Sequence, residues 1–198
     1  MSQGLEQAWS EFESPKYKSY TLGNFREIPQ IQSLSEEKQF EIEVVGNILP
    51  FKTNNYVVEH IIDWNNVLDD PIFILTFPQK NMLRPQHFAQ MSNALKSGSD
   101  KKTIQSIANK IRLQLNPHPA GQMEHNIPQL KDGTKLFGMQ HKYKETVLFF
   151  PSQGQTCHAY CTFCFRWPQF VGIEELKFAS REIDSLVQYL YGDRKSVV

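Results

Sequence analysis

The sequence predicts an α/β fold in which a mostly helical N-terminal region is followed by the first β/α unit of a TIM-like barrel. Three observations predict it. Apolar residues recur at helical spacing between residues 33 and 115, a continuous apolar run lies at residues 146–150, and another helical stripe begins at residue 183. We therefore expect residues 1–140 to form a helical region with a connector, and residues 141–192 to begin the barrel.

The first helix is expected after an irregular arm. Residues 1–32 are polar, rich in aromatic residues and weakly periodic, which predicts no regular element there. Ser33 and Glu36 have the spacing of a capping box, so the helix is expected to begin at Ser33. It is expected to end before Pro50. Its apolar stripe consists of Phe40, Val44, Val45 and Ile48.

Three more helices are expected in the N-terminal region. Residues 56–64 form a short one, and the Asp69-Asp70-Pro71 stretch separates it from the next helix. Residues 86–96 form another, with apolar residues on one face. The last starts near Ser99 and ends at Asn116, because a residue before proline is pushed out of the helical region. Residues 116–142 are expected to be a long connecting segment.

The barrel unit is expected to consist of a strand, a loop and a helix. The apolar run Thr146–Phe150 predicts a strand buried on both faces, as in a parallel sheet. Ser180 has the position of a helix N-cap. The stripe of that helix consists of Ile183, Leu186, Val187 and Leu190. The loop after the strand lies where such barrels place their active sites.

Composition excludes several classes of protein. The 21 basic residues balance the 21 acidic ones, so neither nucleic acid nor an anionic membrane is an expected partner. The N-terminus has no signal peptide, and no apolar run is long enough to span a bilayer. The 3 cysteines, clustered in one short stretch, do not resemble a secreted disulfide framework. We therefore expect a soluble, cytoplasmic protein.

The cysteines Cys157, Cys161 and Cys164 form a C-x₃-C-x₂-C motif directly after the predicted strand. Three thiolates on one loop can hold three irons of a 4Fe–4S cluster and leave the fourth iron open for chemistry. One alternative is a structural zinc site with His141 or His158 as the fourth ligand, although such sites usually use paired C-x₂-C motifs. The other is three inert, buried cysteines.

The loop, with the aromatic Phe163 before the last cysteine, resembles the radical S-adenosylmethionine (SAM) superfamily. The surrounding chain, over roughly residues 30–192, resembles the lysine 2,3-aminomutase family. Three further stretches carry this resemblance: Asp69-Asp70-Pro71-Ile72, Asn116-Pro117-His118-Pro119-Ala120-Gly121, and His141-Lys142-Tyr143 before the strand.

The resemblance implies a radical SAM isomerase that moves an amino group between neighbouring carbons of an amino-acid substrate. The three cysteines would be the cluster ligands, and Phe163 would pack near the adenine of SAM. Arg166 would bind the substrate carboxylate, a task that suits a bidentate guanidinium. An electron donor such as flavodoxin or ferredoxin would reduce the cluster. No residue of this chain is assigned a direct catalytic role.

A second cofactor, pyridoxal 5′-phosphate (PLP), is left open. Lys142 and Tyr143 match two positions that contact PLP in the family, but Thr146 stands where the family has an arginine. Losing a permanent cation weakens a phosphate site. The alternatives are therefore a radical SAM enzyme with another substrate and no PLP, and a non-catalytic zinc or iron–sulfur module.

The C-terminal residues 193–198 are expected to be a non-native tail. Translation of a widely used sequencing-adapter read gives the hexapeptide Asp193–Val198 and then a stop codon. We therefore expect the chain to be truncated within the barrel and inactive by itself. The lysine that binds PLP in the family, a Gly-Gly-Asp motif that contacts SAM and the acidic substrate-binding residues would lie beyond Val198. Whether the full-length protein is a homo-oligomer is left open.

Overall fold

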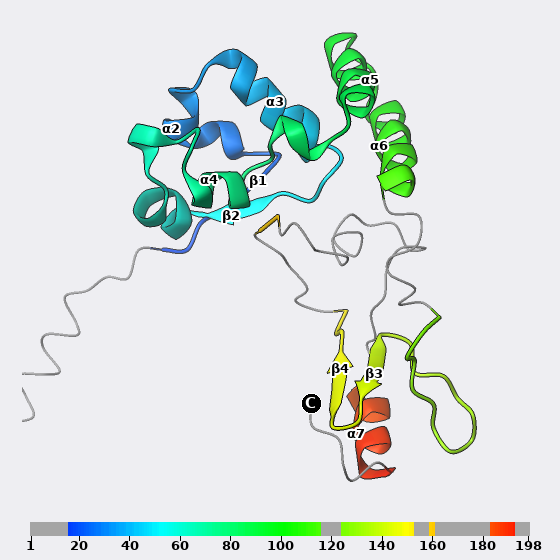
Figure 1. The fold of residues 1–198 in the computed structure, drawn as a ribbon. Coiled ribbons are helices and arrows are strands. Elements are labelled where there is room, and N and C mark those ends of the chain that lie inside the picture. Colours follow the sequence, from blue (N-terminus) through cyan, green and yellow to red (C-terminus); the bar gives the residue numbers. More distant parts are fainter. Residues whose placement is uncertain (1–15, 116–123, 153–158, 161–182, 193–198) are drawn as a thin grey trace, which may run out of the picture.

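The computed structural model of the chain describes residues 16–115, 124–152, 159–160 and 183–192. Figure 1 shows a helical unit over the first range, and a β-hairpin with one helix over the second and last ranges. Each of the two parts buries apolar side chains of its own.

The elements of the helical unit, in order, are β1 (Ser19–Thr21), η1 (Phe25–Glu27), α2 (Pro29–Gln32), α3 (Glu36–Gly46), β2 (Lys52–Asn54), the π-helical η2 (Val57–Ile61), η3 (Trp64–Asn66), α4 (Pro71–Thr76), η4 (Lys80–Met82), α5 (Pro85–Lys96) and α6 (Lys101–Leu115). The second part contains β3 (Met139–Tyr143), β4 (Thr146–Phe149) and α7 (Ile183–Gly192).

The irregular arm expected over residues 1–32 is wrong for residues 16–32. β1 pairs antiparallel with β2, so that Tyr20 lies opposite Thr53. η1 and α2 come directly after β1, and Ile28 and Ile31 are completely buried. These elements are three or four residues long, which is too short to show periodicity. Their regular structure depends on strand pairing and burial against residues far along the chain.

The first long helix begins two residues later than expected. Ser35 is the N-cap of α3, and its hydroxyl accepts the N–H of Lys38 at 3.2 Å. Ser33 instead ends α2 and donates its hydroxyl to the carbonyl of Gln30 at 2.7 Å. The capping box predicted from Ser33 is therefore wrong. The end of the helix at Gly46 agrees with the expected stop before Pro50.

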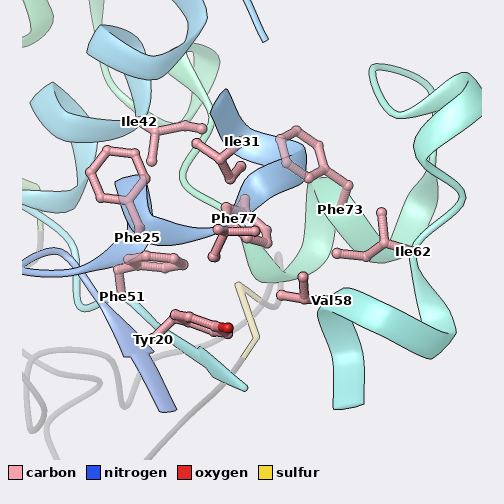
Figure 2. Close-up of a cluster of buried hydrophobic side chains, with 10 residues drawn as sticks. Tyr20, Phe25, Ile31, Ile42, Phe51, Val58, Ile62, Phe73 and Phe77 are labelled. Atoms are coloured by element: carbon pink, nitrogen blue, oxygen red, sulfur yellow. The ribbon is translucent and has the colours of Figure 1, made fainter. Parts of the chain in front are cut away.

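The first hydrophobic cluster is aromatic at its centre. The rings of Phe73 and Phe77 stack with centroids 4.8 Å apart, and Phe51 packs against Phe77 at 5.2 Å. Trp64 meets Phe73 edge-on at 5.8 Å. Figure 2 shows that the side chains of this cluster come from β1, α4 and the segments around them. The expected helix over residues 56–64 is confirmed in part, as η2, and Val58 lies in this cluster.

The second cluster joins α3 to α5 and α6. Its buried members are Val44, Val45, Ile48, Leu83, Met91, Ala108 and Ile111. α5 and α6 confirm the helices expected over residues 86–96 and 99–115. Asp100 precedes α6 and accepts the N–H of Thr103 at 2.7 Å.

The predicted strand is present as β4, but it is not buried on both faces. It pairs antiparallel with β3, and its side chains alternate, with Val147 buried and Leu148 44% exposed. Only two residues separate β3 from β4, which is the connection of a hairpin. An antiparallel pair can leave one face open to solvent, whereas a parallel sheet is covered on both.

The hairpin packs on α7 through a third cluster of Leu136, Met139, Val147 and Leu186. Leu190 also packs there, but Ile183 and Val187 are exposed, so half of the predicted stripe is wrong. The predicted N-cap Ser180 lies outside the described residues. The described strands form two antiparallel pairs, and the barrel stays a prediction. No described helix is both long enough and apolar enough to cross a membrane.

Candidate functional site

The predicted cluster ligands Cys157, Cys161 and Cys164 lie outside the described residues, as do Phe163 and Arg166. Their surroundings are described at two points, the hairpin that precedes them and the pair Ala159–Tyr160 between the first two cysteines.

The hairpin fixes the start of the cysteine segment. Val147 and Phe150 are buried, and the N–H of Phe150 donates to the carbonyl of Gly138 at 2.8 Å. The chain thus leaves β4 from a well-anchored position, a few residues before Cys157. The strand β4 precedes the cysteine motif and the helix α7 follows it, so a strand and a helix are present on either side of the motif.

The second point is Tyr160, which contacts the helical unit. Its N–H donates to the carbonyl of Leu75, the fifth residue of α4, at 2.7 Å. Its phenol oxygen is buried. The residue next to Cys161 therefore lies against α4, in the part of the chain that also carries the Asp69-Asp70-Pro71 stretch. No spacing pattern in the sequence identified Tyr160.

The two predicted PLP contacts, Lys142 and Tyr143, lie side by side at the exposed end of β3. Consecutive strand residues normally point to opposite faces. Here the register is irregular between Gln140 and Tyr143, and the Lys142 ammonium lies 5.5 Å from the centre of the Tyr143 ring. Thr146 is paired directly with Tyr143 across the hairpin.

These three side chains offer an ammonium and two hydroxyl groups at one edge of the hairpin. All three residues are exposed, and Tyr143 is 61% exposed. Ammonium and hydroxyl donors suit the phosphate of PLP, so the residues present fit that group in their chemistry. Of the three, only Lys142 supplies a positive charge, because Thr146 is neutral.

His141, a possible zinc ligand, is engaged with α7. Its Nδ1 lies 2.5 Å from the hydroxyl oxygen of Tyr189, and the two rings meet edge to face with centroids 5.7 Å apart. Among the described residues no group of three or more His, Cys, Asp and Glu side chains could hold a metal. The other proposed ligand, His158, is outside them. Tyr189 is a second contact that sequence reasoning missed.

A hollow of about 480 Å³ lies between residues 129–132 and the C-terminal part of α7. Asp132 lines it, and its pKa is lowered because it accepts the N–H of Thr134 at 2.9 Å. That hydrogen bond closes a local turn. The hollow includes none of the residues predicted to bind a cluster, a cofactor or a substrate.

Comparison with known proteins gives a distant relative. The chain is 23% identical over 160 residues to a protein of Aquifex aeolicus (strain VF5) named putative L-lysine 2,3-aminomutase. The match covers 81% of this chain and 32% of the relative, so the chain spans about a third of that protein's length. No family model matches, and no solved structure matches. The similarity supports a distant aminomutase-like relation.

Proposed function

We propose that this chain is part of a radical SAM enzyme that starts amino-group migration on an amino acid. The observation that carries the proposal is the C-x₃-C-x₂-C motif, found in a chain that is similar to a protein named as an aminomutase. Lysine is named for that relative only, and the substrate of this protein is proposed as an amino acid without specifying which.

Cys157, Cys161 and Cys164 are the proposed ligands of a 4Fe–4S cluster. Thiolates are the ligands that such clusters use, and three of them leave one iron for SAM. When bound, the cluster and SAM supply the radical that removes a hydrogen atom from the substrate. The protein's own residues hold these groups and exclude water.

Arg166 is the proposed substrate-binding residue, and Phe163 is proposed to pack against SAM. A guanidinium offers two parallel N–H donors to a carboxylate, which fixes the orientation of an amino acid as well as binding it. Arg166 would thus supply a permanent positive charge two residues after the last proposed cluster ligand. An amino acid held there by its carboxylate would present its carbon chain near the open iron.

PLP would have fewer charged protein contacts here than the family pattern provides. Lys142, Tyr143 and Thr146 would hold its phosphate group through one ammonium and two hydroxyl groups. Thr146 at the position of the family's arginine is the specific observation that favours the second candidate, a radical SAM enzyme with another substrate and no PLP.

Metal analysis after anaerobic reconstitution tests the cluster. The expected result is iron with labile sulfide, and an electron paramagnetic resonance signal of the reduced protein that changes when SAM is added. Each of the variants Cys157→Ser, Cys161→Ser and Cys164→Ser should lose most of the iron, whereas His141→Gln should retain it. Zinc without sulfide would establish the zinc module instead, and its loss in His141→Gln would identify His141 as the fourth ligand.

The isomerase activity is tested with the full-length protein, SAM, a reductant and a set of amino acids. Movement of the amino group, followed by mass spectrometry of labelled amino acids with and without PLP, is the expected result. Isomerisation without PLP would select the second candidate. A loaded cluster that cleaves SAM but isomerises no amino acid in either condition would remove the aminomutase part of the proposal.

A further inference from the structure

The C-terminal end of α4 presents a carbonyl that local chain cannot satisfy. The last carbonyls of a helix have no partner within the helix. Their nearest possible donors along the chain are the N–H groups three and four residues further on, beyond the helix end. For Leu75 these are residues 78 and 79. Pro78 has no N–H, and the N–H of Gln79 points to the sulfur of Met82 at 3.4 Å. Phe77 is extended, so the helix does not continue.

The partner of Leu75 comes instead from the cysteine segment. The N–H of Tyr160 donates to the Leu75 carbonyl at 2.7 Å, a short and strong geometry for a backbone hydrogen bond. The phenol oxygen of Tyr160 is buried, so the side chain is also covered by protein at this point. Figure 1 draws residues 159–160 as a short orange segment next to the helical unit.

Tyr160 lies between two proposed ligands in the sequence, directly before Cys161 and three residues after Cys157. In any chain, neighbouring Cα atoms are about 3.8 Å apart, and Cα atoms three residues apart are no more than about 11 Å apart. Ordering a backbone residue costs about 1–2 kcal/mol of conformational free energy. Because Tyr160 is already held in place, cluster binding has to supply less of the conformational free energy needed to order the chain between two ligands.

We propose that Tyr160 is a positioning residue, which ties the chain between the first two cysteines of the motif to the C-terminal turn of α4. The helical unit then supports cluster binding through Leu75 and Pro78, although it contributes no ligand. The role of Tyr160 toward the cluster rests on the proposed function. The contact between Tyr160 and Leu75 does not.

Amide hydrogen exchange by NMR on the iron-free chain tests the contact. The Tyr160 amide should exchange at least about tenfold more slowly than an unstructured peptide, because its N–H is hydrogen-bonded and the residue is partly buried. Tyr17 is the matched control, since it is exposed and no hydrogen bond of its N–H is present among the described residues. Equal, fast exchange at both tyrosines would overturn the proposal.

Replacement of Tyr160 by its α-hydroxy acid tests the positioning role. The resulting ester removes the N–H donor and keeps the side chain. The reconstituted ester variant should lose iron to a chelator about fivefold faster than the unmodified chain, the effect of one backbone hydrogen bond. The same replacement at Tyr17 should leave the rate unchanged.

The outcomes separate the two proposals. If the ester at position 160 loses iron no faster than the ester at position 17, the positioning role is overturned while the cluster stands. If the unmodified chain takes up no iron and sulfide, the proposed function fails, and the positioning role fails with it. A protected Tyr160 amide would then still establish the contact with α4.

Discussion

Among the charged residues that the structure describes, Arg112 in α6 has the smallest exposed fraction. Its Nε donates to the carbonyl of Ile48 at 2.6 Å, and one terminal nitrogen donates to the carbonyl of Asn47 at 3.1 Å. These carbonyls come just after the end of α3, where a helix leaves its own acceptors unpaired. Arg112 therefore joins α6 to the end of α3 beside the second cluster.

Burial lowers the pKa of Arg112 to about 10, and the group is still a cation at neutral pH. Because the folded-state pKa lies below the ordinary value, the unfolded chain binds this proton more tightly. The contribution of Arg112 to stability is therefore constant below about pH 10 and rises only above it, as the pH passes toward the unfolded value.

Arg112→Met should lower the free energy of unfolding by about 3 kcal/mol, because the buried carbonyl of Ile48 and the partly buried carbonyl of Asn47 both lose this donor. Urea denaturation measures the loss. Lys110→Met, on an exposed position of the same helix, should change stability by less than about 0.5 kcal/mol. Equal effects of the two substitutions would contradict the role given to Arg112.

The start of helix α4 depends on a buried carboxylate. Asp70 is its N-cap and accepts the N–H of Phe73 at 2.6 Å, while its other oxygen accepts the N–H of Asp63 at 3.2 Å. Pro71 occupies the first helical turn, where its missing N–H costs nothing. The Asp-Asp-Pro stretch that resembles the aminomutase family thus has a structural use in this chain, the start of the helix that contacts Tyr160.

Asp70→Ala should cost about 2 kcal/mol, because the buried N–H of Phe73 and the partly buried N–H of Asp63 both lose their acceptor. Its neighbour Asp69 is exposed, so Asp69→Ala is a matched control with an expected change of less than about 0.5 kcal/mol. Thermal unfolding followed by circular dichroism compares the two. The assignment of Asp70 as the cap would be wrong if Asp69→Ala were the more destabilising substitution.

The hairpin and α7 are joined by a polar contact besides their apolar cluster. Tyr189→Phe removes the hydroxyl next to Nδ1 of His141 and should cost about 1 kcal/mol. Amide exchange should then become faster in α7 and stay unchanged in α3. Tyr191→Phe is the control, since that side chain is 81% exposed and should have no effect.

The described core residues divide between two parts of the chain. All members of the first and second clusters lie between Tyr20 and Leu115, and all members of the third lie between Leu130 and Leu190. A stretch of about 100 residues with its own core is long enough to fold alone. The hydrogen bond from Tyr160 to Leu75 ties the cysteine segment to the first part.

A chain of residues 16–115 should therefore fold by itself, with a helical circular dichroism spectrum and one cooperative thermal transition. Phe77→Ala in this chain should cost about 3–5 kcal/mol, because the ring is completely buried between Phe51 and Phe73. Broad, non-cooperative unfolding of the unsubstituted chain would show that the second part is needed.

Elements with a local signal could be predicted from the amino-acid sequence alone. α5 and α6 are long enough for their apolar residues to repeat several times, and proline limits α6 on the C-terminal side. The cysteine spacing likewise predicts cluster chemistry without any structure, because the ligand type and the short loop are both written in the chain.

Features that depend on partners far along the chain became visible only in the folded molecule. Three features need groups from another part of the chain: the regular structure of residues 16–32, the direction in which β4 pairs, and the contact of Tyr160 with Leu75. Even the choice between Ser33 and Ser35 as the cap of α3 depended on α2, which occupies the residues just before it. Periodicity is visible within one segment, whereas a hydrogen bond between segments leaves no pattern in either of them.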